Sequence, residues 1–285
     1  METHTTKQKI LNLTITKIVL ALLIFMAVVV IGQQIASKLL ALTPLDRDYR
    51  NLLKGILIST AAVSTYIFLF KKYEKRSINE FSGKGLVKNL IMGSAIGFAL
   101  QSLVILVIYI NGYYQITAVN PVSFILIPLA LMFTVAIIEE ILVRGIIFRL
   151  LEEKLGSYLA LAISSLIFGG LHLANPNSNF LSTLCITTAG FLLGSAFIYR
   201  RNLWFPIALH FAWNFTQSGI YGAITSGNEK TTGWLTTEIK GPDIITGGAF
   251  GPEGSIQATV ICLMATVFLL ILSHRNNQII AKSKK

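Results

Sequence analysis

Apolar residues dominate this chain in long runs that short polar segments separate. A run of about 18 residues or more is long enough for a helix to cross the roughly 30 Å hydrocarbon core of a bilayer. We predict eight such helices, at 14–36, 52–70, 89–110, 122–150, 157–173, 180–199, 203–222 and 256–273. The predicted fold class is therefore all-α, as a polytopic helical membrane protein with about eight transmembrane helices.

The polar connections leave no room for a soluble domain, so residues 1–285 are predicted to form one membrane domain. The apolar run after Lys7, Lys9 and Lys17 resembles a signal sequence, but the residues beyond it make a poor cleavage site and favour an uncleaved anchor. Four parts are expected: N-terminal spans at 1–120, a core at 121–222, an extracytoplasmic loop at 223–255, and a last span with a basic tail at 256–285. The loop is rich in Gly, Thr and charge and is expected to be solvated, without chemistry of its own.

Composition supports a membrane protein, because 53% of the residues are hydrophobic, 13% are charged and the mean hydropathy is +0.67. Soluble domains carry roughly 25% charged residues. Both cysteines, Cys185 and Cys262, fall inside predicted spans. We interpret them as small buried apolar residues rather than as a disulfide or a metal site.

Basic residues predict the orientation in the membrane. With the N-terminus inside, 18 of the 24 Lys and Arg residues fall on the inner side, including Lys7, Lys9, Lys284 and Lys285 near the chain ends. The other six are Lys38, Arg47, Arg50, Lys54, Lys230 and Lys240. Both termini are therefore predicted to be cytoplasmic. The net charge of +11 follows from these loops and favours contact with anionic lipid headgroups, not with nucleic acid.

Two adjacent glutamates, Glu139 and Glu140, interrupt the apolar run at 122–150. An ionised side chain at membrane depth costs roughly 2.5 to 3.5 kcal/mol on insertion scales, so it usually faces a protein interior or a watery cavity. On a helix Glu140 and Arg144 share one face, whereas Glu139 is rotated by about 100° and has no partner at helical spacing. This pattern predicts a structural Glu140–Arg144 pair and a reactive Glu139. The alternative is a buried salt-bridge cluster that only holds helices together.

Further polar side chains lie in two apolar runs downstream. His172 closes the run at 157–173, and His210 and Asn214 lie four residues apart on one predicted helical face. Each alone is as well explained by interhelical hydrogen bonding. Together with Glu139 they supply a base, an imidazole and two donors for an oxyanion, which is enough to hydrolyse an amide. On ideal upright helices His172 would lie deeper than the other groups, so convergence requires tilted or short helices.

These residues form three ordered motifs: Glu-Glu-x-x-x-Arg at 139–144, Phe-x-x-x-His at 168–172 and His-x-x-x-Asn at 210–214. The motifs resemble those of the CPBP intramembrane proteases, a family that includes the CAAX prenyl endopeptidases and the Abi bacteriocin-immunity proteins. The resemblance covers roughly residues 120–222, and the details of that region look like bacterial members. It implies an integral protein of a bacterial cytoplasmic membrane that cleaves a membrane-associated or lipidated peptide or protein.

The resemblance also implies roles for the motif residues. Glu139 would activate the attacking water with help from His172, His210 and Asn214 would form the oxyanion hole, and Glu140 with Arg144 would support the site. It favours a mechanism without a cofactor. A zinc-dependent version, with Glu139, His172 and His210 as ligands, is the alternative, because two histidines and a carboxylate suit a catalytic zinc.

Two other classes of function remain open from the sequence. A non-catalytic immunity or scaffold protein would use the same fold for binding alone. A transporter would use buried Glu and His residues as a proton relay, but the two halves of the chain show no inverted repeat or matched pair of broken helices. The sequence does not identify the substrate.

Overall fold

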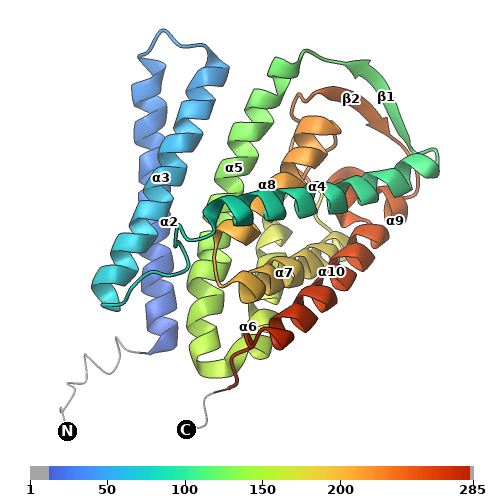
Figure 1. The fold of residues 1–285 in the computed structure, drawn as a ribbon. Coiled ribbons are helices and arrows are strands. Elements are labelled where there is room, and N and C mark those ends of the chain that lie inside the picture. The colour runs from blue at the N-terminus through green and yellow to red at the C-terminus, as the bar shows by residue number, and fades with distance from the viewer. Residues whose placement is uncertain (1–12, 283–285) are drawn as a thin grey trace, which may run out of the picture.

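A computed structural model describes residues 13–282 and shows a helical protein with one small pair of strands (Figure 1). The helices are α2 (Thr14–Ala41), α3 (Arg47–Tyr73), α4 (Leu86–Ile110), α5 (Leu126–Glu140), α6 (Arg149–Leu171), α7 (Phe180–Arg200), α8 (Trp204–Phe215), α9 (Asp243–Thr246) and α10 (Ile256–Arg275). Wide π-helical turns join α5 to α6 at Ile141–Phe148 and extend α8 at Thr216–Ile220. The strands are β1 (Tyr114–Val119) and β2 (Leu235–Ile239).

The predicted class, a helical membrane protein, is confirmed. Six helical stretches among the described residues are long and apolar enough to cross a bilayer: Thr14–Ala41, Arg47–Tyr73, Leu86–Ile110, Val122–Ala174, Phe180–Arg200 and Ile256–Arg275. The fourth stretch contains two of the predicted runs, 122–150 and 157–173. The chain turns sharply between these runs at Gly156, whose φ of 75° and ψ of 168° are not helical. The predicted run at 203–222 forms α8 and its π turn, and α8 itself has 12 residues. The number of true spans and the side of the termini stay predictions.

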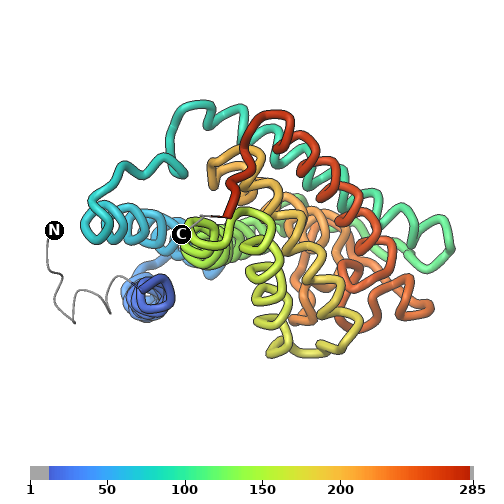
Figure 2. The backbone as a smooth tube through the Cα atoms, turned by 90° about the horizontal axis from the view of Figure 1, so that it is seen from below, coloured from blue at the N-terminus to red at the C-terminus, as the bar shows by residue number. Residues whose placement is uncertain are grey.

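The helices differ strongly in direction. Figure 2 shows α2, α3 and α5 nearly end-on, whereas α4, α7 and α10 run across the same view. Helix α4 packs on α8, α7 packs between α6 and α10, and α3 packs between α2 and α5. A Cβ on Gly97 of α4 would lie 2.3 Å from the carbonyl oxygen of Leu209, and one on Gly93 would lie 2.6 Å from that of Phe205. The two backbones therefore touch, as small residues permit in membrane proteins.

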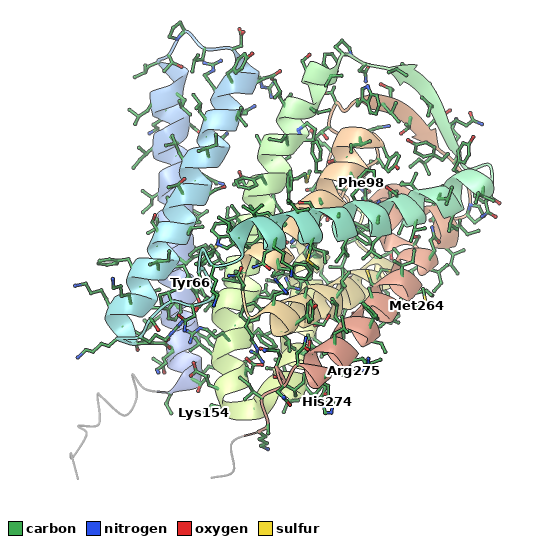
Figure 3. All side chains as sticks on the ribbon, in the orientation of Figure 1. Tyr66, Phe98, Lys154, Met264, His274 and Arg275 are labelled. Carbon is green, nitrogen blue, oxygen red and sulfur yellow. The ribbon has the colours of Figure 1, made fainter. Side chains whose placement is uncertain are left out.

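The loops predicted to be cytoplasmic lie together at one end of the molecule. Arg201 Nη1 binds Glu152 Oε2 at 2.5 Å, the Ile280 amide donates to Ser157 Oγ at 2.9 Å, and the Leu203 amide donates to the Glu80 carbonyl at 2.7 Å. Lys154, His274 and Arg275 lie at this end (Figure 3), as do the start of α2 and the end of α10. Of the basic residues used to predict the orientation, Lys7, Lys9, Lys284 and Lys285 lie outside the described residues.

Glu80 is the centre of a polar cluster at this end. Its side chain accepts hydrogen bonds from Arg76 Nη1 at 3.0 Å and Nη2 at 2.5 Å, and from the hydroxyl of Tyr66. Burial alone would raise the pKa of the Glu80 carboxyl, but the hydrogen bonds from Arg76 and Tyr66 outweigh burial and hold that pKa below its ordinary value. The cluster therefore stabilises the folded protein while Glu80 is ionised.

The loops predicted to be extracytoplasmic lie together at the other end. Asn120 Nδ2 donates to the Gly233 carbonyl at 2.9 Å, and Asn175 Nδ2 donates to the Ser226 carbonyl at 3.0 Å. The structure thus groups the connections into the two sets that the sequence places on opposite sides of the membrane.

Segment 223–255 differs from the solvated loop that we predicted. Its strand β2 pairs antiparallel with β1, from Tyr114 opposite Ile239 to Val119 opposite Leu235. Phe250 and Glu253 are buried. The prediction was wrong because glycine and charge indicate solvent exposure on average, whereas here the glycines permit tight backbone packing. A Cβ on Gly251, at φ 110°, would lie 2.3 Å from the Ile224 carbonyl oxygen.

Candidate active site

Glu140 and Arg144 form the ion pair that their spacing predicts. The pair is almost fully buried, with 0% and 1% of the two side chains exposed. Arg144 Nη1 donates to Glu140 Oε1 at 2.8 Å, and Nη2 donates to the Gly190 carbonyl at 3.0 Å. The guanidinium also lies over the ring of Phe168, 4.6 Å from its centre. Arg144 lies in the π turn after α5, a type of irregularity that is frequent at functional sites.

Glu140 has a second partner that sequence spacing did not indicate. The same oxygen, Oε1, lies 2.9 Å from His210 Nδ1, which reaches it from α8. Because a carboxylate only accepts hydrogen bonds, Nδ1 carries a proton and donates to Glu140. The pair therefore fixes the imidazole and leaves Nε2 of His210 facing away from Glu140.

Glu139 approaches the other ring nitrogen of His210, because its Oε2 lies 3.9 Å from Nε2. Its side chain is 29% exposed, and Oε2 has no hydrogen-bond partner among the described residues. A gap of this length between two polar atoms suits an intervening water. Glu139 is thus the more exposed carboxylate of the two and, among the described residues, has no Lys or Arg in salt-bridge contact with it, as the helical spacing predicted.

His172 lies in the short turn His172–Ala174 that follows α6. Its Nδ1 lies 2.8 Å from the carbonyl oxygen of Phe168. Because a carbonyl only accepts, Nδ1 carries the proton and Nε2 is left free. A histidine held in this way presents a nitrogen that can take or give a proton.

A cavity of about 530 Å³ brings the predicted residues together. Its wall includes all four predicted catalytic residues: Glu139, His172, His210 and Asn214. The depth mismatch expected for upright helices disappears, because the chain breaks at Gly156 within α6 and the short α8 is packed against the steeply inclined α4. Asn175, Asn228 and Thr231 also line the cavity, so it extends into the loops at the end remote from Lys154.

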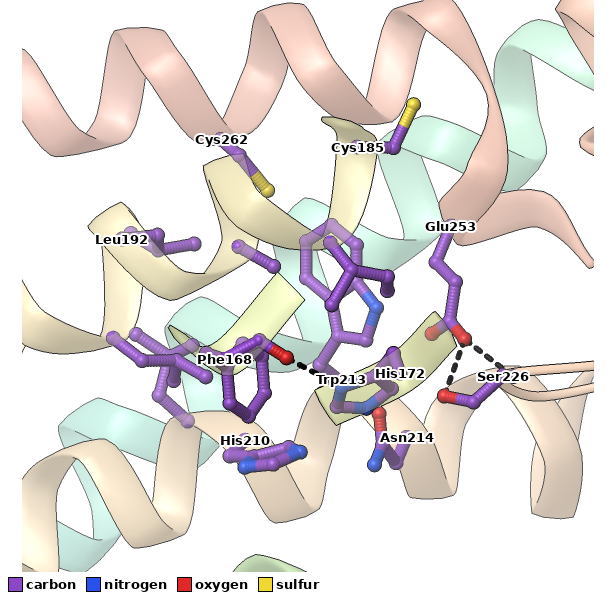
Figure 4. Close-up of a pocket in the computed structure, with 14 residues that line it drawn as sticks. Phe168, His172, Cys185, Leu192, His210, Trp213, Asn214, Ser226, Glu253 and Cys262 are labelled. Carbon is purple, nitrogen blue, oxygen red and sulfur yellow. Dashed lines mark hydrogen bonds between the residues drawn. The ribbon is translucent and has the colours of Figure 1, made fainter. Parts of the chain in front are cut away.

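A smaller chamber of about 30 Å³ adjoins this cavity and shares His172, His210, Asn214 and Ser226 with it (Figure 4). Its volume accommodates about one water molecule. Apolar side chains of α7 and α8 form much of its wall, together with Cys185 and Cys262, which are buried free thiols as predicted.

The chamber contains one ionisable residue that sequence reasoning missed, Glu253. It lies in the turn Pro252–Gly254 immediately before α10 and is 5% exposed. The available signal was an isolated acidic residue in a Gly-Pro-Glu-Gly segment at the start of an apolar run. That signal does not indicate which distant residues the carboxylate meets.

The zinc alternative finds no support in the arrangement of donors. No group of three or more His, Cys, Asp or Glu side chains among the described residues is placed to hold a metal ion. Glu140 holds one ring nitrogen of His210 and a backbone carbonyl holds one of His172, so each histidine keeps a single free nitrogen.

Comparisons with known proteins find similarity over the region that contains this site. Residues 121–216, which include every predicted site residue, match the family described as type II CAAX prenyl endopeptidase Rce1-like. Over 78 residues the chain is 36% identical to a protein of Bacillus subtilis (strain 168) named "Putative membrane peptidase YdiL". That alignment covers 27% of this chain and 30% of the relative, so the chain matches less than a third of the relative's length. No solved structure matches the chain.

Proposed function

We propose that this chain, whose residues 121–216 match the type II CAAX prenyl endopeptidase Rce1-like family, is an intramembrane endopeptidase. It hydrolyses a peptide bond in a membrane-associated or lipidated substrate. The observation that carries the proposal is the meeting of Glu139, His172, His210 and Asn214 at one cavity, although they come from three separate helical segments. Such a cavity supplies water and a fixed set of proton donors and acceptors within an apolar protein.

The reaction begins with a water molecule between Glu139 and His210. Glu139 accepts a proton from this water as its oxygen attacks the carbonyl carbon. The carbonyl oxygen becomes negative and is stabilised by the amide N–H of Asn214 and by Nε2–H of the doubly protonated His210, whose Nδ1–H remains bound to Glu140. The C–N bond then breaks, and Nε2–H of His172 gives its proton to the leaving nitrogen. The proton held by Glu139 restores His172, and the products are a carboxylic acid and an amine, which ionise to a carboxylate and an ammonium group.

The position of the cavity limits the class of substrate. The cavity extends toward the loops at 174–179 and 223–231, which belong to the end that is poor in basic residues. Under the predicted orientation this end is extracytoplasmic. The scissile bond would therefore lie near the outer surface of the membrane, which favours an exported or membrane-anchored peptide over a C-terminus that is prenylated in the cytoplasm.

The experiment that tests the function compares peptide ends in membranes of cells that express the wild type or Glu139→Gln at matched levels. Ends found only with the wild type would support proteolysis and identify the substrate. Identical ends, with any bacteriocin resistance retained by the variant, would contradict proteolysis and favour a non-catalytic immunity role. Stoichiometric zinc lost together with activity on chelation would overturn the metal-free mechanism.

A further inference from the structure

A second large cavity lies between α5 and the hairpin of helices α2 and α3. Its volume is about 370 Å³, and we call it the hairpin groove. Of the described residues that line it, only Leu131 also lines the active-site cavity, so the two spaces are distinct. The α2 and α3 sides of the groove carry five polar side chains: Gln33, Gln34, Ser37, Asn51 and Lys54.

These five side chains have no protein partner. Within the described part of the chain, none of them forms a hydrogen bond or an ion pair. Lys54 is half-buried, and no described Asp or Glu lines the groove. An ammonium group and three side-chain amides without partners lose hydrogen bonds when they face lipid chains instead of water. The groove therefore offers several donors and one positive charge to an anion that carries several acceptor oxygens.

Basic residues are concentrated at the same place. Four of the six basic residues predicted on the outer side belong to the hairpin: Lys38, Arg47, Arg50 and Lys54. The hairpin has two acidic residues, Asp46 and Asp48, near its turn, and neither lines the groove. Figure 1 shows that turn at the same end of the molecule as β1 and β2. Because basic residues are disfavoured on the outer side, a group of four there indicates a local role.

The groove lies near the border between the hydrocarbon core and the lipid headgroups. Helix α2 has 28 residues and is about 42 Å long, so when centred it exceeds a core of roughly 30 Å by about 6 Å at each end. Gln34 lies about 10 Å from the end of α2 at Ala41, and Lys54 lies about 10 Å from the start of α3 at Arg47. The two residues are thus at the same height, from which a lysine side chain extends to the level of the phosphates.

We propose that the hairpin groove binds the phosphate headgroup of an anionic phospholipid from the leaflet at this end. Lys54 provides the charge, and the amides of Gln34 and Asn51 donate to the phosphate oxygens. The acyl chains lie along the apolar part of the wall, which includes Ile58 and Ile127. Basic pockets between transmembrane helices are a known way of binding such headgroups. A lipid suits the groove better than a soluble anion, because the groove lies at membrane depth and part of its wall is apolar.

The test is native mass spectrometry of the purified full-length protein, which resolves single bound lipids. The probes are phosphatidylglycerol, phosphatidylcholine with the same acyl chains, and inorganic phosphate. We expect the first phosphatidylglycerol to bind more tightly than phosphatidylcholine, whose choline group cancels the phosphate charge. Lys54→Gln should weaken binding of that phosphatidylglycerol by about 5-fold, as expected for one cation beside an anionic lipid. Lys54→Arg keeps the charge and should bind as the wild type does.

Lys240→Gln is the matched control. Lys240 is an exposed cation at the same end of the molecule, where it pairs with Glu238 outside the groove, so its loss should leave the affinity unchanged. In detergent without added lipid, all three variants should melt with the wild type, because Lys54 has no protein partner to lose and the Lys240–Glu238 pair is exposed.

Several results would overturn the inference. Equal affinity of the wild type for the two lipids would remove the role of net charge, and Lys54→Gln that binds like the wild type would remove the role of Lys54. An equal loss in Lys240→Gln would indicate general surface charge. A lower melting temperature of Lys54→Gln without lipid would make Lys54 a structural residue. Inorganic phosphate that displaces the lipid at equal concentration would indicate a site for soluble anions. None of these results bears on peptide cleavage, which Glu139→Gln tests separately.

Discussion

The buried pair of Glu140 and Arg144 allows stability and catalysis to be separated in one experiment. Because the two side chains are 0% and 1% exposed, replacing Arg144 by Met leaves the Glu140 charge buried without its guanidinium partner, with only the Nδ1–H of His210 bound to it. Breaking a buried ion pair in this way costs about 3–5 kcal/mol. At roughly 2–4 °C per kcal/mol for chains of 150–250 residues, this predicts a fall in melting temperature of roughly 6–20 °C. Glu140→Met should have a similar effect by leaving Arg144 unpaired.

The double variant Glu140→Met/Arg144→Met removes both charges and fills the space with apolar atoms. Replacing a whole buried pair by apolar residues is often neutral or stabilising, so most of the lost stability should return. Activity should not return, because His210 Nδ1 loses the acceptor that holds it at 2.9 Å. Loss of such an orienting partner typically lowers activity about 10- to 100-fold.

The assay is thermal unfolding of the detergent-solubilised protein at one scan rate, with all four members of the cycle measured together. The four melting temperatures give the coupling energy between Glu140 and Arg144, which are in direct contact. Single variants that melt with the wild type, or a double variant destabilised by the sum of both losses, would refute the reasoning. A double variant with full cleavage activity would show that Glu140 does not orient His210.

Three further predictions test the packing, the polar cluster and the orientation. Gly97→Ala should lower the melting temperature by an amount equivalent to about 1–3 kcal/mol and slow cleavage, because the added Cβ would meet the backbone of α8. Gly170→Ala is the control and should melt as the wild type does, because no atom lies within 4 Å of its Cβ. Since the folded-state pKa of Glu80 is lowered, its contribution is present at neutral pH, above the ordinary value of 4.5, and is lost as the pH falls through the folded-state pKa. Glu80→Gln should therefore melt lower than the wild type at pH 7 and lose less stability on acidification, whereas an unchanged pH dependence would contradict this role. A cysteine at Asn228 should react with a membrane-impermeant maleimide on intact cells and one at Lys154 only after lysis; the reverse pattern would invert the orientation.

Long apolar runs identify the segments that are long enough to cross a bilayer, so the sequence predicted most of the helical architecture. It also predicted the Glu140–Arg144 pair, since residues four apart on a helix are neighbours in any fold. The loops also fell into the two predicted sets, because a short connection between two long helices reverses the direction of the chain.

The remaining features depend on contacts between distant segments. The spacing of His210 and Asn214 indicates a shared helical face but not that Glu140 binds His210 from another helix. The break at Gly156 and the inclination of α4 decide how deep each group lies, and neither is visible in hydropathy. The sequence did not single out Glu253, because its neighbours in sequence are glycines and proline. Ser226, His172 and Asn214, which line the chamber with it, lie 27 or more residues away.

The central claim is that Glu139 activates a water molecule to cleave a peptide bond. The most direct test uses purified protein in lipid vesicles, with a quenched peptide that spans the identified cut, in water enriched in ¹⁸O. We expect one ¹⁸O atom in each new carboxyl end, and a rate for Glu139→Gln lower by at least about 100-fold, as expected for loss of a general base. Cleavage by Glu139→Gln at the rate of the wild type, or new ends without ¹⁸O, would contradict it.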